Sequence, residues 1–383
     1  MIQPSLDVMA AEFRRQMPVH RQWTYLDHAA VAPISQPAAE ALRTWTDEAA
    51  TAGATVWPKW GQHVEDARRL AARIVGAAPE EIALIPNTTA GISLVAEGFP
   101  WQPGDNVVAP ADEFPSNQYP WMNLGSRGVE LRRVEMPVGR MDFDRLESAC
   151  DARTRIVSVS WVAYANGWRN DATELAALAH RHGALLFLDA IQGLGAFPLD
   201  ATAAGVDFLA ADGHKWLLGP EGAGVFYIRR EHLARLRPIG VGWHSVLQGH
   251  DFTNIKLAFK PAAERYEGGS LNMPGVLALG ASMELLLSLG IDHVARRIIE
   301  VTELACRRLA EIGAEVVSCR EPKHASGIVS FELPGRDLAD VRRRLLAENI
   351  LLSHRAGRLR ISPHAYNTAE DIEKLIEALG RCR

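Results

Sequence analysis

The sequence predicts an α/β protein, with a large domain around a mostly parallel sheet and a small α/β domain after it. Between about residues 80 and 230, short apolar runs alternate with amphipathic helical patterns. This alternation is typical of a parallel sheet whose crossover helices cover both faces. The run ALLFLD, which ends at Asp189, is apolar on both faces, as a central parallel strand is. After about residue 230, two long helical patterns and a shorter α/β series follow.

The elements follow from the spacing of apolar residues. In Ala172–His182, for example, Leu175, Leu178 and Ala179 share one helical face. The strands predicted for the large domain are Ile82–Ile85, Asn106–Ala109, Val129–Val134, Ile156–Trp161, Ala184–Leu188, Val206–Ala210 and Ala223–Ile228. The later elements are helices Val276–Leu289, Asp292–Glu311, Asp337–Glu348 and Thr368–Leu379, with strands Ile328–Leu333, Ile350–Leu352 and Arg358–Ile361.

Chain length and the change of pattern predict two domains. At roughly 150 residues per domain, 383 residues leave room for one large and one small domain. We place the large, cofactor-binding domain at residues 21–265 and the small domain at residues 266–383. Residues 1–20 are expected to fold back onto the small domain.

Composition excludes several classes of function. Lys and Arg number 41 and Asp and Glu 46, so the net charge of −5 disfavours nucleic acid and anionic membrane surfaces as partners. The N-terminal segment carries Asp7 and Glu12 where a signal peptide needs an apolar run, and no stretch approaches about 18 apolar residues. Four scattered cysteines form no CxxC pair and predict neither a disulfide framework nor a metal site. We therefore expect a cytoplasmic protein.

Two charged side chains follow neighbouring predicted strands. Asp189 ends the strand ALLFLD, and Lys215 follows the strand VDFLAA in the motif DGHKW. Ligands of an open parallel sheet bind where its strands end, so both side chains are expected at one site. A lysine amine forms a Schiff base with an aldehyde cofactor, and a carboxylate keeps the ring nitrogen of pyridoxal 5′-phosphate protonated. Spacing alone also fits a loop-capping Asp189 and a solvated Lys215.

The segment NTTAG, between a strand and a helix, suits a phosphate. We expect Thr88 to be the N-cap of that helix. Helix N-termini present free N–H groups and a positive dipole end to anions. A plain capped helix would have the same sequence, so this motif is weak by itself.

Seven short motifs occur in order along nearly the whole chain. They are YLDHAA, NTTAGISLVA, DEFPSNQYPW, LDAIQ, DGHKWLLGPEG, EGGSLN and LRISPHAYNTAEDI. In this series the chain resembles the class V aminotransferase family of fold type I pyridoxal-phosphate enzymes. That group includes cysteine desulfurases, selenocysteine lyases, isopenicillin N epimerase-like proteins and kynureninases. The resemblance implies the fold type I architecture and pyridoxal 5′-phosphate as the cofactor.

The resemblance also implies a role for each matching residue around the cofactor. Lys215 matches the Schiff-base lysine, Asp189 the partner of the pyridine nitrogen and Gln192 the partner of the phenolic oxygen. Lys215 and Asp189 are therefore the expected catalytic residues. The other matches are Thr88, Thr89 and His214 near the phosphate and Phe114 stacked on the ring.

On the substrate side, Arg360 matches the arginine that binds the α-carboxylate, to which a guanidinium donates two parallel hydrogen bonds. Tyr164 replaces an asparagine of the desulfurases and is expected to donate to the ring or the substrate. His28 either lines the substrate pocket or caps a turn. Ser270 and Asn272 match a segment that reaches a neighbour's phosphate, which implies a homodimer with shared active sites.

The chain departs from the desulfurase pattern in places that bear on its chemistry. The interval AENILLSHRAGRLR before Arg360 holds no cysteine and is shorter than its desulfurase counterpart, so a persulfide-forming desulfurase is not expected. Phe114 replaces a histidine and offers no proton. Asp212 replaces a serine that bonds the phosphate, and because an acid repels a phosphate we expect its side chain to turn elsewhere or to act through water.

We predict an enzyme that acts at the Cα of an amino acid, with Lys215 as the general base. Transamination, epimerisation and β-elimination share the same residues. Aminotransferase-like chemistry is the first prediction, and a C–S or selenocysteine-type β-lyase or an epimerase is the alternative. A nicotinamide oxidoreductase would need GxGxxG after the first strand, which is missing. A non-catalytic scaffold would not be expected to keep Lys215, Asp189 and Arg360.

Overall fold

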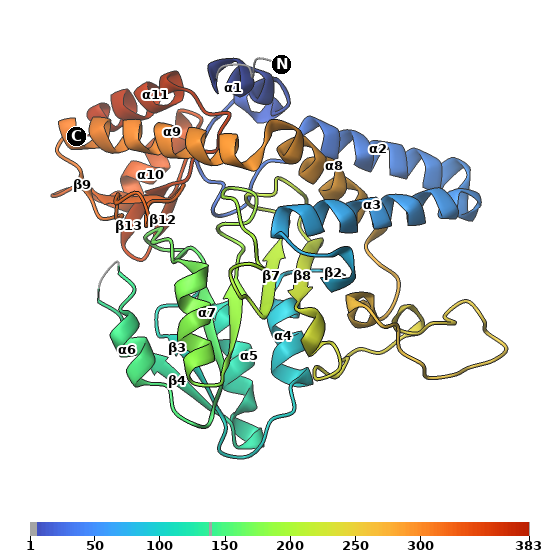
Figure 1. Cartoon of the computed structure of the whole chain (residues 1–383). Helices are drawn as coiled ribbons and strands as arrows, with labels where there is room; N and C mark the ends of the chain where they lie inside the picture. Colours follow the sequence, from blue (N-terminus) through green and yellow to red (C-terminus); the bar gives the residue numbers. More distant parts are fainter. Residues whose placement is uncertain (1–5, 138–139, 383) are drawn as a thin grey trace.

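The computed structural model describes residues 6–137 and 140–382. Its centre is a seven-stranded sheet (Figure 1). The strands are β2 (Ile82–Ile85), β3 (Asn106–Pro110), β4 (Glu130–Val134), β5 (Thr154–Ser160), β6 (Leu185–Asp189), β7 (Phe208–Asp212) and β8 (Gly224–Ile228). Their order is β2-β8-β7-β6-β5-β3-β4, and only β8 runs against the others. The predicted mostly parallel sheet is confirmed.

One strand lies further along the chain than predicted. The expected range was Val206–Ala210, but β7 ends at Asp212 because Ala211 and Asp212 continue the antiparallel pairing with β8. Asp212 is therefore the last residue of a strand, and the loop that carries Lys215 begins directly after it.

Alternate side chains of the central strands enter two separate cores. In β6, Leu186 and Leu188 pack on one face of the sheet and Phe187 on the other. This period of two is the geometry of an extended strand. The first core also receives apolar residues of α3, α7 and α8, and the second receives those of α4 and α5. The helices that precede residue 290 are α1 (Leu6–Arg15), α2 (Gln36–Thr51), α3 (Trp57–Val75), α4 (Thr88–Gly98), α5 (Tyr119–Met122), α6 (Phe143–Ser148), α7 (Ala172–Arg181) and α8 (Met273–Leu289).

The C-terminal part of the chain forms a second, four-stranded antiparallel sheet with its own apolar core. The strand order is β12-β13-β10-β9. A short parallel pair, β1 (Thr24–Tyr25) with β11 (Ile350–Leu351), ties the N-terminal region to this part. The domain boundaries themselves stay a prediction. The remaining elements are α9 (Ile291–Glu311), β9 (Glu315–Val316), β10 (Val329–Glu332), α10 (Leu338–Ala347), β12 (Ser353–Arg355), β13 (Arg358–Ile361) and α11 (Ala369–Arg381).

Helices α8 and α9 join the two parts. Gly290 stands between them with φ 82°, in the left-handed region that glycine tolerates, and the axes bend there by 81°. Among the described residues no single helix is long and apolar enough to span a membrane, although this bent pair together passes that test by length and composition.

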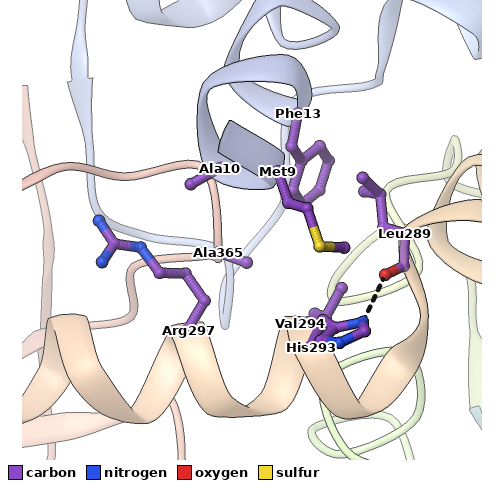
Figure 2. A pocket seen from close by; sticks show the side chains of 8 residues that line it. All are labelled: Met9, Ala10, Phe13, Leu289, His293, Val294, Arg297 and Ala365. Carbon is purple, nitrogen blue, oxygen red and sulfur yellow. Dashed lines mark hydrogen bonds between the residues drawn. The ribbon is translucent and has the colours of Figure 1, made fainter. Parts of the chain in front are cut away.

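Helix α1 packs against the start of α9. Figure 2 shows Met9 and Phe13 of α1 facing Leu289 and His293 across a small cavity of about 20 Å³. Arg14 adds a 2.8 Å ion pair to the carboxylate of Asp371 in α11. Residues 6–15 therefore lie against the C-terminal part of the chain, and residues 1–5 are outside the described range.

A buried ion pair fixes the segment that leads to Ser270. The carboxylate of Glu267 is 1% exposed, accepts from Arg68 of α3, and also accepts from the backbone N–H of Leu84 in β2 at 3.0 Å. The Arg68 guanidinium also donates to the carbonyl of Ile82 at 2.9 Å. One carboxylate thus joins a helix, an edge strand and a loop.

We expect Glu267→Ala to lower the free energy of unfolding by about 3–5 kcal/mol, because it leaves a buried guanidinium short of its closest acid. The urea unfolding midpoint measures the loss. Glu264→Ala is the matched control, because Glu264 is 3.9 Å from Arg68 and 26% exposed; it should cost less than about 1 kcal/mol. If both variants lowered the free energy of unfolding equally, the buried ion pair between Arg68 and Glu267 would contribute no more than the more exposed one between Arg68 and Glu264.

Candidate active site

A cavity of about 230 Å³ opens where β6 and β7 end. The carboxyl ends of parallel strands are the usual ligand site of such sheets. Thr88, Thr89, Phe114, Tyr164, Gln192, His214, Lys215 and Arg360 line the cavity, as predicted site residues. Asp212 and Arg355 line it as well. The other predicted site residues, Asp189, His28, Ser270 and Asn272, do not belong to the lining.

Asp189 is the last residue of β6, two residues before the lining residue Ile191, and is 2% exposed. Burial raises the pKa of its carboxyl to about 6, although Lys215 and the hydrogen bond from Ile191 oppose this shift. The Ile191 N–H donates to Oδ1 at 3.1 Å, and no described residue donates to Oδ2. The carboxylate therefore keeps acceptor capacity for a protonated ring nitrogen.

Lys215 is 8% exposed, and its Nζ lies 5.5 Å from the centroid of the Phe114 ring. Burial lowers the pKa of its amine to about 8, with Asp189 acting in the opposite direction. The loop is closed by hydrogen bonds from Leu218 N to Lys215 O (3.1 Å) and from Gly219 N to Gly213 O (2.9 Å). Leu218 has φ 57°, a conformation that costs a non-glycine residue about 1–2 kcal/mol. Local strain thus accompanies the placement of the lysine.

The phosphate end of the cavity differs from the prediction in one detail. Asn87, not Thr88, is the N-cap of α4, because its side chain accepts from Ala90 N at 2.9 Å. Thr88 is the first helical residue, and its Oγ1 accepts from Asp212 N at 3.0 Å, which leaves its own hydroxyl proton to donate. Thr89 donates to the hydroxyl of Ser116 at 2.8 Å.

Asp212 turns its carboxylate toward a histidine. Its Oδ2 lies 3.0 Å from Nδ1 of His214, without the angle of a hydrogen bond, and its Oδ1 is buried with no hydrogen-bond partner among the described residues. Asp212 lines the cavity together with His214, and its predicted turn away from the phosphate, or action through water, stays a prediction.

The side-chain amide of Gln192 already makes two hydrogen bonds within the protein. Its Nε2 donates to the carbonyl of Ala29 at 3.0 Å, and its Oε1 accepts from Trp216 at 2.9 Å. The second N–H of the amide remains for the ring oxygen to which the prediction assigns it.

Arg360 occupies the middle of the second sheet, since β13 pairs with both β10 and β12. It is 1% exposed, and its Nη1 donates to the carbonyl of Tyr164 at 2.6 Å. Nη2 lies 3.4 Å from Oδ1 of Asp27. Its buried Nε has no hydrogen-bond partner among the described residues. A buried, unpaired N–H that belongs to a cavity-lining guanidinium fits a carboxylate ligand.

The structure does not bring His28 to the cavity. The side chain is fully buried, with Nδ1 2.9 Å from the carbonyl of Ser362 and Nε2 2.8 Å from the hydroxyl of Tyr366. Burial lowers the pKa of the imidazole well below its usual value. Both nitrogens are thus used within the protein, and we do not retain the predicted substrate contact.

Ser270 and Asn272 also lie apart from the cavity. Asn272 caps α8 by accepting from Gly275 N, and its Nδ2 donates to Gly222 O at 3.0 Å. Ser270 is exposed beside a second cavity of about 380 Å³. Their predicted contact with a neighbouring subunit stays a prediction.

Glu113 is a site residue that sequence reasoning missed. Its carboxyl accepts from Ser160 N at 2.6 Å and bonds the Ser160 hydroxyl, and Ser160 pairs with Asp189 across β5 and β6. Burial raises the pKa of this carboxyl to about 7. Glu113 thereby anchors the segment that carries Phe114. The sequence did offer one signal for this residue, because Glu113 directly precedes Phe114, the ring predicted to stack on the cofactor.

These side chains fit pyridoxal 5′-phosphate. Asp189 offers an unused acceptor, Thr88 lies at the N-terminus of α4 with His214 in the same cavity lining, and Lys215 is a shielded amine with a lowered pKa. The model of one family, described as aminotransferase class-V, matches residues 24–375. The chain belongs to the class V aminotransferase family. It is therefore a pyridoxal 5′-phosphate enzyme, as the sequence motifs predicted.

Known proteins are similar over almost the whole chain. A probable cysteine desulfurase of Methanothermobacter thermautotrophicus is 32% identical and covers 96% of both chains. An uncharacterised aminotransferase of Bacillus subtilis is 26% identical and covers 98% of both. Among solved structures, an apo cysteine desulfurase of Thermococcus onnurineus superposes with a TM-score of 0.88 at 25% identity, covering 100% of this chain and 99% of its own. The predicted fold type I architecture is confirmed.

The raised pKa of Asp189 predicts how the stability of the cofactor-free protein depends on pH. The folded pKa of about 6 lies above the usual aspartate value of 3.8, so the contribution of this group to stability is fully present below about pH 4 and lost as the pH rises through 6. At pH 7 the loss is about 3 kcal/mol, at about 1.4 kcal/mol per pKa unit.

Asp189→Asn removes this titration. The variant should therefore gain about 3 kcal/mol on the wild type between pH 4 and pH 7 in urea unfolding. The exposed Asp144→Asn serves as the control and should follow the wild type at every pH. A stability difference for Asp189→Asn that does not change with pH would contradict the buried, titrating carboxylate.

Proposed function

We propose that the enzyme is a lyase that eliminates a leaving group from the Cβ of an α-amino acid without a protein thiol. One observation carries the proposal: the cavity that holds Lys215 has no cysteine in its lining. Cys150, Cys306, Cys319 and Cys382 all lie elsewhere. Relatives named as desulfurases support cleavage at the bond from Cβ to sulfur. This choice ranks β-elimination above the transamination that the sequence placed first.

Each step has a side chain suited to it. When bound, pyridoxal 5′-phosphate supplies an electron sink that makes the Cα proton of an amino acid acidic. The substrate's α-carboxylate binds the buried guanidinium of Arg360, whose unpaired Nε is ready to donate. A pKa of about 8 leaves part of the Lys215 amine neutral near neutral pH, so it can accept the Cα proton. Asp189 holds the proton on the ring nitrogen by its negative charge.

The proposed elimination balances without an oxidant. The Cα–H bond breaks and its proton goes to Nζ of Lys215, while the Cβ–S bond breaks and its electron pair leaves with sulfur. The unsaturated product reacts with water to give a keto acid and ammonium. Phe114 and Tyr164, whose ring centroids are 5.3 Å apart, border the cavity in which this reaction is proposed.

The proposed assembly is a two-fold homodimer. The yellow loop that extends from the body in Figure 1 exposes a group of large apolar side chains, and such a group marks a surface that another protein covers. The group consists of Leu247, Phe252, Ile255 and Leu257. Ser270 follows this loop and, in the proposed dimer, contacts the cofactor phosphate bound by the neighbouring subunit.

Transamination is the second candidate, because a relative that covers 98% of the chain is named as an aminotransferase. It would use the same Lys215, with proton return to the cofactor in place of loss of a leaving group. The two reactions can be distinguished by their products, because elimination releases ammonium and transamination passes the amino group to an acceptor keto acid.

Lys215 should carry the cofactor covalently. Reduction of the yellow protein with borohydride, followed by peptide mapping, should place the label on the peptide that contains DGHKW. Lys215→Arg should remove the covalent label, whereas the control Lys260→Arg should keep it. A label on any other lysine would refute the assignment.

Elimination should proceed without cysteine in the protein. With L-cysteine and other amino acids that carry a leaving group at Cβ, a variant with all four cysteines replaced by serine should keep turnover within about threefold. The products should be a keto acid and ammonium in equal amounts, formed without an added amino acceptor. Turnover that needs an acceptor keto acid would identify transamination. A single cysteine replacement that stops turnover in a folded, cofactor-loaded protein would also contradict the proposal.

A further inference from the structure

A tight hairpin places an arginine at the mouth of the candidate active site. Strands β12 and β13 pair with Arg355 opposite Arg358, so only Ala356 and Gly357 remain in the turn. Their φ values are 48° and 76°, and a two-residue turn with both central residues left-handed matches the twist of its strands. Arg355 is the last residue of β12 and lines the cavity, in the cysteine-free interval before Arg360.

Unlike the neighbouring arginines Arg358 and Arg360, Arg355 has no acidic side chain as a partner among the described residues. Arg358 forms a 2.7 Å ion pair with Glu332, and Arg360 lies 3.4 Å from Asp27. The guanidinium of Arg355 makes no hydrogen bond or ion pair with any described residue, and the residue is exposed. The free guanidinium thus borders the cavity in which the substrate is proposed to bind.

The charge of the cavity lining is unbalanced. Lys215, Arg355 and Arg360 are basic, and Asp212 is the one carboxylate among the lining residues that the structure describes. Burial raises the pKa of Asp27 and lowers the pKa of Lys215 and of Arg360, and the charge of Arg355 adds a smaller lowering contribution to each. Arg355 therefore lies near the carboxylate-binding end. With the α-carboxylate assigned to Arg360 and the cofactor phosphate assigned to the end of the cavity that Thr88 lines, Arg355 has no assigned anion.

We propose that Arg355 binds a second anion, on the substrate side chain, so that the enzyme selects α-amino acids whose side chain ends in a carboxylate or sulfinate. The inference rests on the proposed function, in which Arg360 holds the α-carboxylate. A guanidinium fork matches the two oxygens of either group. A neutral side chain would give the guanidinium of Arg355 no anion from the substrate.

The test uses the cofactor-loaded enzyme and ligands without an amino group, which bind but do not react. Glutarate carries two carboxylates and pentanoate, of the same chain length, carries one. Calorimetry should show that Arg355→Gln weakens glutarate binding roughly tenfold, as for loss of one charge-assisted contact. Pentanoate binding should stay the same. Arg358→Gln is the matched control, because it removes a charge from the same hairpin that already has an acid partner; both affinities should be unchanged.

Arg360→Ala separates this inference from the proposed function. It should weaken both glutarate and pentanoate; if it weakens neither, the proposed carboxylate site is wrong. If both ligands depend on Arg360 but glutarate does not depend on Arg355, the second-anion site alone is wrong. Loss of cofactor from Arg355→Gln would assign the residue to the cofactor phosphate and would also overturn the inference.

Turnover gives an independent comparison. S-carboxymethyl-cysteine and S-ethyl-cysteine each lose a thiolate from Cβ and differ in that the first carries a carboxylate where the second carries a methyl group. The kcat/KM of the wild type should favour S-carboxymethyl-cysteine. Arg355→Gln should reduce that preference roughly tenfold through KM, because the contact is lost in the ground state as well as in the transition state. A preference that survives the substitution would contradict the proposed role.

Discussion

A carboxylate buried at the end of a central strand is the constraint on which the site depends. Asp189 receives one hydrogen bond from the protein, and its backbone is pinned on both sides by Trp161 N to Asp189 O (2.8 Å) and Ala190 N to Ala210 O (3.0 Å). These backbone hydrogen bonds hold the Asp189 carboxylate in a buried position, where water does not stabilise its negative charge. A cofactor that supplies a positive partner offsets this burial, so binding and folding are thermodynamically linked.

The central sheet could be predicted because its signal is local. A strand such as β6, apolar on both faces, has few alternatives, and the charged residues that follow such strands fall at one edge by topology alone. The motifs added the role of each residue. Asn87 and Thr88 are both good caps, so the true start of α4 had to come from the structure.

The remaining differences arise from contacts between distant parts of the chain. His28 meets Ser362 across 334 residues, and no local pattern distinguishes a histidine buried in this way from one at a pocket. Strand β12 is only three residues long and polar, so no apolar alternation marks it. Glu113 resembles a surface acid in sequence, and its importance follows from the register that puts Ser160 beside Asp189.

The turn at Ala356 and Gly357 also bears on how a product would leave. A desulfurase that forms a persulfide on its own thiol keeps the sulfur attached until an acceptor arrives. Here the corresponding interval is a short hairpin, fixed by cross-strand pairing and without a thiol. In the proposed elimination, with no thiol in this hairpin or in the cavity lining, the expelled leaving group departs as a free small molecule. In that reaction its fate depends on diffusion and dilution.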